Sequence, residues 1–167
     1  MEDERKSIDR RKLLKRYAAG ERDFAGIRIS SSGLDGEDLR SIDLSGADLI
    51  GVDLSGSNLS HANLSGANML CVNLYAANLS HANLRGVDLS GADCRGANLA
   101  FADLDEAILT ATDFTGAEFD GTEIENAILI ATDFRAAQNF NGPGQGCLVC
   151  KTFWADGEFF KGPDWYE

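Results

Sequence analysis

The sequence predicts an all-β solenoid, in which the chain winds repeatedly around one axis, with a short α-helix covering its beginning. Two observations lead to this prediction. Every fifth residue from Phe24 to Phe134 is apolar, without a slip in register. Two residues before each of them stands a mostly small residue, often Ala, and the residue between the two is usually Asp or Asn. The repeating unit is A-(D/N)-L-x-x, and we call its Leu the central residue.

A period of five fits neither a straight helix nor a flat strand. In an α-helix, successive central residues would lie about 140° apart and spread around the cylinder. In a strand, an odd period would turn every second Leu to the wrong face. The pattern becomes regular if the chain turns once per unit. The central residue and the small residue then point inward together, while the Asp or Asn points outward.

Four such units are expected to form one coil. The segment Ala-Ile-Leu-Thr-Ala-Thr-Asp-Phe that begins at Ala107 returns at Ala127 as Ala-Ile-Leu-Ile-Ala-Thr-Asp-Phe, and related segments begin at His61 and His81. Both offsets are 20 residues. Residues separated by this offset should therefore stack about 4.8 Å apart, as neighbouring strands do, and the repeats should make about five to six coils.

This uninterrupted run of units resembles the pentapeptide-repeat family. The segment from Arg16 to Phe24 is also similar to the entry into the repeats in cyanobacterial members. The resemblance implies a right-handed quadrilateral β-helix. It also implies a mostly non-catalytic role, because the functions known for the family are diverse and a fold alone does not fix function.

The beginning of the chain is predicted to be a tail and capping helix within residues 1–20. Ser7 is a candidate N-cap for a helix over residues 8–19, and Gly20 is its expected end. One side of this helix carries Leu13, Leu14, Tyr17 and Ala18. We expect that side to cover the apolar end of the solenoid, since an uncapped repeat array exposes its core.

Residues 21–139 are assigned to the repeats, and residues 140–167 to a Gly-rich linker with an aromatic tail. The linker includes Asn-Gly-Pro-Gly-Gln-Gly from Asn141 to Gly146. The tail is expected either to fold back over the last coil or to remain free as a docking segment. Its aromatic residues favour the first alternative, because so many are rarely all exposed.

Charge and composition exclude several classes of function. The chain has a net charge of −12, and residues 20–139 carry six basic and nineteen acidic residues. Such a surface argues against direct nucleic-acid binding and against an anionic membrane. No stretch approaches the roughly 20 apolar residues of a membrane span. The charged N-terminal segment has no apolar run typical of a secretory signal, and the four scattered cysteines indicate a reducing compartment. We expect a cytoplasmic monomer or weak homodimer.

The sequence offers few groups for chemistry, and we expect neither catalytic residues, nor a cofactor, nor a metal site. Cys147 and Cys150 form a C-x-x-C pair, for which a redox or metal role, a disulfide and two inert thiols all remain open. Cys71 should point outward and Cys94 inward.

His61 and His81 should stack in one corner column between Ser41 and Phe101. We interpret the two histidines as solvated surface residues, because neighbouring imidazoles repel each other once both are protonated.

The most informative outward feature is an apolar stripe on one side of the coil. Ile108 and Ile128 stand where the pattern calls for Asp or Asn. We predict a protein-contact face, with cover by the aromatic tail as the alternative. Its members are Ile50, Leu70, Cys71, Ile108, Ile128 and Ile130.

These observations favour a non-catalytic scaffold that binds an unidentified protein partner, and they do not favour an enzyme. The resemblance adds an alternative, because acidic members of the family act as DNA mimics that bind type II topoisomerases. The acidic repeats suit that alternative. The shortness of the solenoid and the lack of inserted loops do not.

Overall fold

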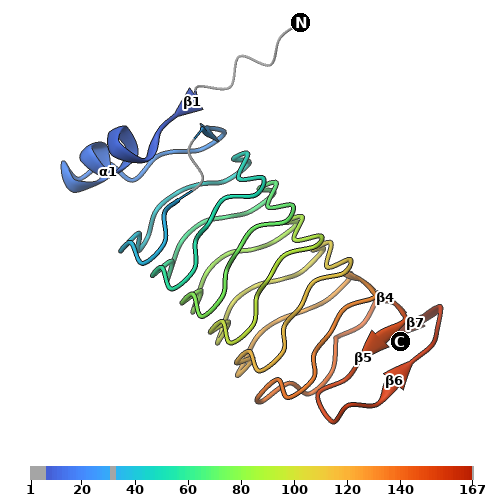
Figure 1. Ribbon diagram of the computed structural model, residues 1–167. Helices are drawn as coiled ribbons and strands as arrows, with labels where there is room; N and C mark the ends of the chain where they lie inside the picture. Colours follow the sequence, from blue (N-terminus) through green and yellow to red (C-terminus); the bar gives the residue numbers. More distant parts are fainter. Residues whose placement is uncertain (1–6, 31–32, 167) are drawn as a thin grey trace, which may run out of the picture.

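The computed structural model describes residues 7–30 and 33–166 and shows one column of stacked coils (Figure 1). Most of the column consists of turns joined by isolated β-bridges. Residues 1–6 of the predicted N-terminal tail lie outside the described residues. The named elements are β1 (Ser7–Ile8), α1 (Arg10–Ala18), β2 (Arg28–Ile29), β3 (Ile128–Ile130), β4 (Cys147–Cys150), β5 (Thr152–Phe153), β6 (Phe159–Phe160) and β7 (Asp164–Tyr166).

The coils stack with an offset of 20 residues. Asp43 pairs with Asn63, Asn63 with Asn83 and Asn83 with Asp103, always in parallel. Backbone hydrogen bonds flank each of these pairs, so that beside Asn63 the Leu64 amide donates to the Asn83 carbonyl at 2.7 Å. This ladder confirms the prediction that four units make one coil.

The predicted central residues form the core of every coil. All of them from Phe24 to Phe134 are buried, and most have no exposed surface at all. We call the four faces of the coil A, B, C and D in chain order. In one coil their central residues are Leu84 (face A), Leu89 (face B), Cys94 (face C) and Leu99 (face D).

The outward Asp and Asn residues have a structural role at the corners. The side-chain oxygen of each accepts a hydrogen bond from the amide two residues later, as Asn63 does from Ser65 and Asp93 from Arg95, both at 3.2 Å. Such Asx bonds stabilise turns, and they explain why these two residue types recur at this position.

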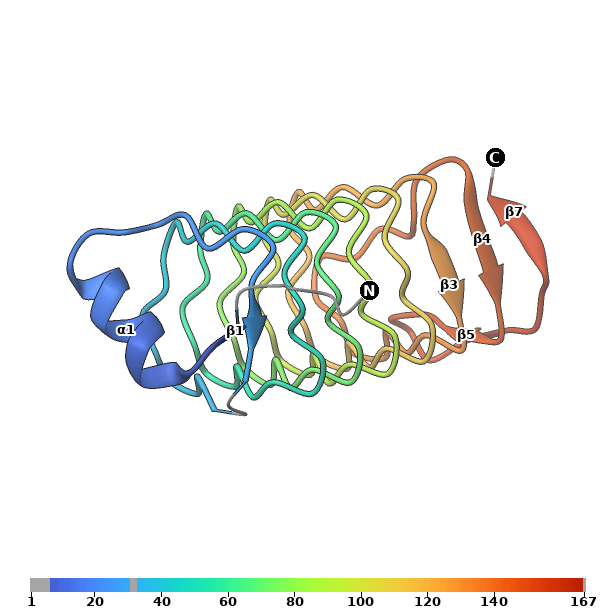
Figure 2. The same ribbon diagram turned by 90° about the horizontal axis from the view of Figure 1, so that it is seen from above.

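The N-terminal end is covered by α1, which lies against the first coils (Figure 2). Leu13 is fully buried there, while Leu14 and Tyr17 pack partly buried against the core. The predicted beginning of the helix was wrong. Asp9 is the N-cap, accepting from the Lys12 amide at 2.8 Å, whereas Ser7 belongs to β1, which pairs in parallel with β2. Ala18 was expected on the covering side of the helix, but it is exposed.

The C-terminal end is built differently, because the ladder continues beyond residue 139. Strand β4 pairs in parallel with β3, and Asp133 pairs with Phe153 at the same 20-residue offset. The segment assigned to the tail therefore supplies part of a further coil. Its remaining strands turn back, so that β7 pairs antiparallel with β4 and β6 antiparallel with β5 (Figure 1).

Candidate protein-contact face

The predicted apolar stripe on face B divides into two patches. Ile108 pairs with Ile128, and Ile128 with Leu148, so these three outward residues lie on successive coils. The polar residues Ser90 and Thr110 lie between this group and the other predicted members. Ile50 is 54% exposed and Cys71 is exposed, while Leu70 is half-buried. The structure thus brings Ile108, Ile128 and Ile130 together and leaves Ile50, Leu70 and Cys71 apart from them.

The second patch extends further than the sequence indicated. Leu148 lies opposite Trp165 in the antiparallel pair of β4 and β7, and directly opposed residues project from the same side of a sheet. Trp165 is 64% exposed, the largest exposed fraction among the large apolar residues that the structure describes. We call this patch, which consists of Ile108, Ile128, Ile130, Leu148 and Trp165, the B strip.

The sequence left open that the aromatic tail covers this face. In the structure the tail does not cover the B strip. Strand β4 instead continues the strip by one coil, and β7 ends it with Trp165 (Figure 2). Ile108 is 36% exposed, and Ile128 and Ile130 are half-buried. The strip is therefore an accessible apolar surface.

Face A borders the strip with negative charge. The carboxylates of Asp103, Asp105 and Glu123 lie within 4.8 Å of one another. Arg85 pairs with Asp105 at 3.0 Å and also with Glu106, so one cation offsets part of this charge. A ligand bound on the B strip would therefore meet an acidic margin on the face A side.

The C-x-x-C pair does not form the candidate disulfide. Cys147 points inward and is buried, whereas Cys150 is half-buried on the other side of β4, and both thiols are free. The Cys147 thiol donates to the Ile124 carbonyl at 3.3 Å, and burial raises its pKa above the ordinary value. As predicted, Cys71 points outward and Cys94 is buried, where desolvation raises the pKa of the Cys94 thiol as well.

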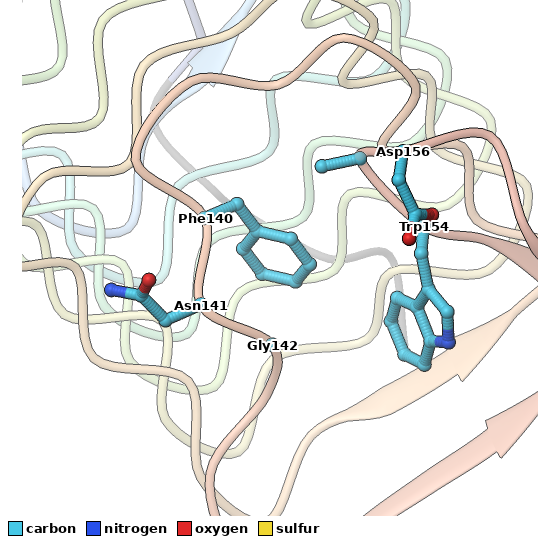
Figure 3. A pocket seen from close by; sticks show the side chains of 6 residues that line it. Phe140, Asn141, Gly142, Trp154 and Asp156 are labelled. Carbon is cyan, nitrogen blue, oxygen red and sulfur yellow. The ribbon is translucent and has the colours of Figure 1, made fainter.

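A hollow of about 290 Å³ opens at the C-terminal end of the solenoid (Figure 3). Phe140 and Trp154 face it, with ring centroids 6.1 Å apart, and Asp156 supplies the carboxylate of its lining. The ring of Phe140 stacks on Phe134 at 4.2 Å, so it also closes the core. One carboxylate beside aromatic rings does not make the pair of acid and base, or of nucleophile and base, that catalysis requires.

No helix among residues 7–30 and 33–166 is long and apolar enough to cross a membrane.

The ladder, the Leu and Ala core and the flat outer faces define a class of protein, the β-helical repeat proteins. Residues 38–70, 67–100 and 92–129 match the pentapeptide repeats, in eight copies, and the chain belongs to this family. Proteins of this family form a right-handed β-helix and are generally structural, non-catalytic scaffolds. No curated protein shows significant similarity to the chain.

Several solved structures are similar to the chain. HetL, a pentapeptide repeat protein involved in heterocyst differentiation regulation in Nostoc sp. strain PCC 7120, is 22% identical, with 92% of this chain and 100% of that chain covered and a TM-score of 0.45. A pentapeptide repeat protein of the Arabidopsis thaliana thylakoid lumen is 33% identical, with 64% and 71% covered and a TM-score of 0.36. QnrB1, a plasmid-mediated fluoroquinolone resistance protein, is 17% identical, with 90% and 83% covered and a TM-score of 0.39. The family assignment rests on the repeats and not on these superpositions.

Proposed function

We propose that the protein is a non-catalytic scaffold that binds a protein partner through the B strip. The observation that carries this proposal is the interruption of a polar column. On the earlier coils this column holds polar residues, yet apolar residues occupy the next three coils and end at an exposed Trp. The polar residues are Arg28, Asp48, Asn68 and Asp88. Exposed apolar patches with a Trp at one end are typical of contact surfaces between proteins.

Charge supports the same face. None of the five side chains of the B strip is ionisable, whereas the outward columns of the other faces carry many carboxylates. Binding at the strip would bury apolar area without removing a charge from water, which is the costly step at a charged interface. The acidic margin on face A favours a partner with basic residues beside its apolar ones.

The structure offers matched variants to test the proposal. Ile108→Asp combined with Ile128→Asp restores the residue type that the column carries at Asp88, so the fold should be retained. Asn98→Asp adds a carboxylate at the equivalent position of face D and serves as the control for the added charge. The partner should first be captured from extracts of the native cell, identified and purified.

Affinity should then be measured for the purified pair by calorimetry. We expect the double variant, and separately Trp165→Ala, to weaken binding by about 30-fold, since truncating a central contact residue costs about 2 kcal/mol or more. The Asn98→Asp control should bind as the wild type does. Equal affinity of the wild type and the double variant would contradict the proposal.

The alternative is a DNA mimic that binds a type II topoisomerase, and the acidic columns of faces A and C favour it. Asp53, Asp93, Asp113 and Asp133 lie on face C, although arginines pair with the last three of them. A supercoiling assay tests this alternative directly. Unchanged topoisomerase activity at micromolar concentrations of the protein would remove it. We also propose a cytoplasmic location, which the free thiols support.

A further inference from the structure

A ladder of stacked rings runs along the corner between faces D and A. Ser41, His61, His81, Phe101 and Gly121 occupy this corner on successive coils, all with positive φ between 56° and 64°. The rings of His61 and His81 have centroids 4.8 Å apart and are 4° from parallel. Those of His81 and Phe101 are 5.1 Å apart and 9° from parallel. The predicted stacking of the two histidines is confirmed, and Phe101 extends it.

The two ends of this ladder differ. At one end the ring of Phe101 lies over Gly121, where an added Cβ would come within 2.5 Å of Phe101 Cδ1, so the next position is filled. At the other end Ser41 carries only a hydroxymethyl group. His61 therefore has no ring stacked on its outer face among the described residues. That end opens into a hollow of about 480 Å³, lined by Tyr17, Arg22, Asp38, Arg40, Ser41 and His61.

The far side of the hollow comes from the N-terminal cap. The Tyr17 hydroxyl donates to the Arg40 carbonyl at 2.8 Å, which fixes the ring of Tyr17 beside the first coils. The Arg22 guanidinium lies 3.8 Å from the centroid of that ring, and its Nη1 donates to the Tyr17 carbonyl at 2.9 Å. Its Nε and Nη2 make no hydrogen bond within residues 7–30 and 33–166. These contacts fix the position of Arg22 and leave its Nε and Nη2 available to donate to a ligand.

The lining is positive, in contrast to the rest of the solenoid. Arg40 bonds Asp38 through Nε at 2.9 Å and Nη2 at 2.7 Å, so this pair is neutral. Arg22 then leaves one net positive charge in the hollow, in a chain whose net charge is −12. A hollow of this volume falls in the range of about 300–1,000 Å³ that small-ligand sites occupy.

We propose that this hollow binds a mononucleotide, a planar heteroaromatic ring that carries phosphate. The ring stacks on the outer face of His61 as the next member of the ladder, in the space that the small side chain of Ser41 leaves. The phosphate lies at the free donors of Arg22, because guanidinium groups bind phosphate oxygens in a planar, paired geometry. A long nucleic acid is disfavoured, since the acidic coils beyond the hollow would repel it.

Nuclear magnetic resonance can observe the stacking directly, because the chain contains only two histidines. Adenosine 5′-monophosphate is the probe, with adenosine and inorganic phosphate as its parts. We expect saturable upfield shifts of the His61 ring signals, caused by the stacked base, and much smaller shifts for His81. Adenosine 5′-monophosphate should bind at least about tenfold more tightly than either part, since stacking on an aromatic ring contributes about 1–3 kcal/mol.

Three variants, compared by calorimetry, locate the site. Ser41→Phe fills the vacant position, and Phe101 shows that this corner accepts an aromatic residue at positive φ. His61→Ala removes the stacking surface, and Arg22→Gln removes the phosphate donors. Each should weaken binding at least about tenfold, while the control His81→Ala, one coil further from the hollow, should change it less than about threefold. Circular dichroism checks that each variant is folded.

Four results would overturn the proposal. The first is the absence of a saturable His61 shift at about 10 mM nucleotide, a limit that corresponds to negligible affinity. The second is unchanged binding by Ser41→Phe. The third is equal affinity for phosphate alone, which would indicate a simple anion site. The fourth is an equal loss in His61→Ala and His81→Ala. None of these results bears on the B strip, so the two proposals can fail separately.

Discussion

The middle coils and the C-terminal end share the same 20-residue ladder but fill it with different residues. In the middle, Leu64 and Leu84 are fully buried, the equivalent positions of the neighbouring coils also hold Leu, and Ala fills the small positions. At the C-terminal end, Phe114 stacks on Phe134 at 5.3 Å, and Phe140 stacks on Phe134 at 4.2 Å. The comparison teaches that identical neighbours suffice inside the array, whereas the end needs large side chains because no further coil covers it.

The small inward positions change in the same direction. Thr112, Thr132 and Thr152 replace Ala towards the C-terminal end, and each is buried. Their hydroxyls donate to the carbonyls of Leu89, Leu109 and Leu129, each at 2.8 Å. These side-chain bonds tie successive coils together where the regular ladder approaches its end.

The largest effect should follow from breaking the middle. Leu84→Ala should lower the free energy of unfolding by about 2–5 kcal/mol, because it leaves a cavity that the coils on either side cannot collapse to fill. Urea denaturation measures this loss. Val149→Ala, in the last coil, is the comparison. It should cost less and should speed hydrogen exchange only at the C-terminal end, since repeats couple mainly to their neighbours. Equal costs at both sites would contradict the distinction.

A smaller effect should follow from removing one of the threonine hydroxyls. Thr132→Val keeps the shape of the side chain but removes the bond to the Leu109 carbonyl. We expect a loss of about 0.5–1.5 kcal/mol in unfolding free energy, the usual net contribution of such a bond. Thr115→Val, at a half-buried outward position of the preceding coil, should change stability by less than about 0.5 kcal/mol. A loss at Thr115 as large as that at Thr132 would refute the role of the inward hydroxyl.

The smallest effect concerns acid pH on the outer surface of the middle coils. Arg95 bonds Asp93 through Nε at 2.8 Å and Nη2 at 2.6 Å and holds the pKa of that carboxyl below its usual range. A lowered pKa in the folded state stabilises the protein above the unfolded pKa of about 3.9 and loses that contribution as the pH falls through the folded value.

Stability measured from pH 6 down to about pH 2 should therefore fall less steeply for Asp93→Asn than for the wild type. Asp53→Asn changes the same column of face C at a carboxylate that makes no ion pair within the described part of the chain. It should leave the slope nearer to that of the wild type. A flatter slope in Asp53→Asn than in Asp93→Asn would show that the Arg95 pair is not the cause.

The regular part of the fold could be predicted residue by residue, because each unit meets the same surroundings as the unit one coil away. The C-terminal end could not be predicted to the same degree. The two central positions after Phe134 hold Asn139 and Gly144, which are not large apolar residues, so the five-residue pattern can no longer be followed there. The chain turns at Asn139 with a φ of 54°, so that Phe140 instead packs on the core. One signal in the sequence does indicate this further coil. The segment that begins at Ala107 and returns at Ala127 has a weaker third copy that begins at Cys147, in which Val149 takes the place of Leu129 and Thr152 that of Thr132.

The candidate site was predictable only in its repeating part. Ile108 and Ile128 break a five-residue pattern, and that signal is local. Trp165 reaches the B strip through the antiparallel return of β7, which no period in the sequence indicates. The hollow beside His61 depends on Tyr17 and Arg22 of the N-terminal segment. Contacts between the cap and the coils do not repeat along the chain, so sequence periodicity cannot reveal them.

The division of each coil into four equal units has a consequence for how such a chain changes length. Removing or adding five residues within the repeats keeps every local pattern intact, yet it turns all later residues by a quarter of a revolution about the axis. Ile128 and Trp165 would then lie on a different side of the column from Ile50 and Leu70. Only a change of 20 residues preserves the alignment of the two ends, as the pairing of Asp43 with Asn63 illustrates. Natural variants of this protein that keep both surfaces should therefore differ in length by whole turns.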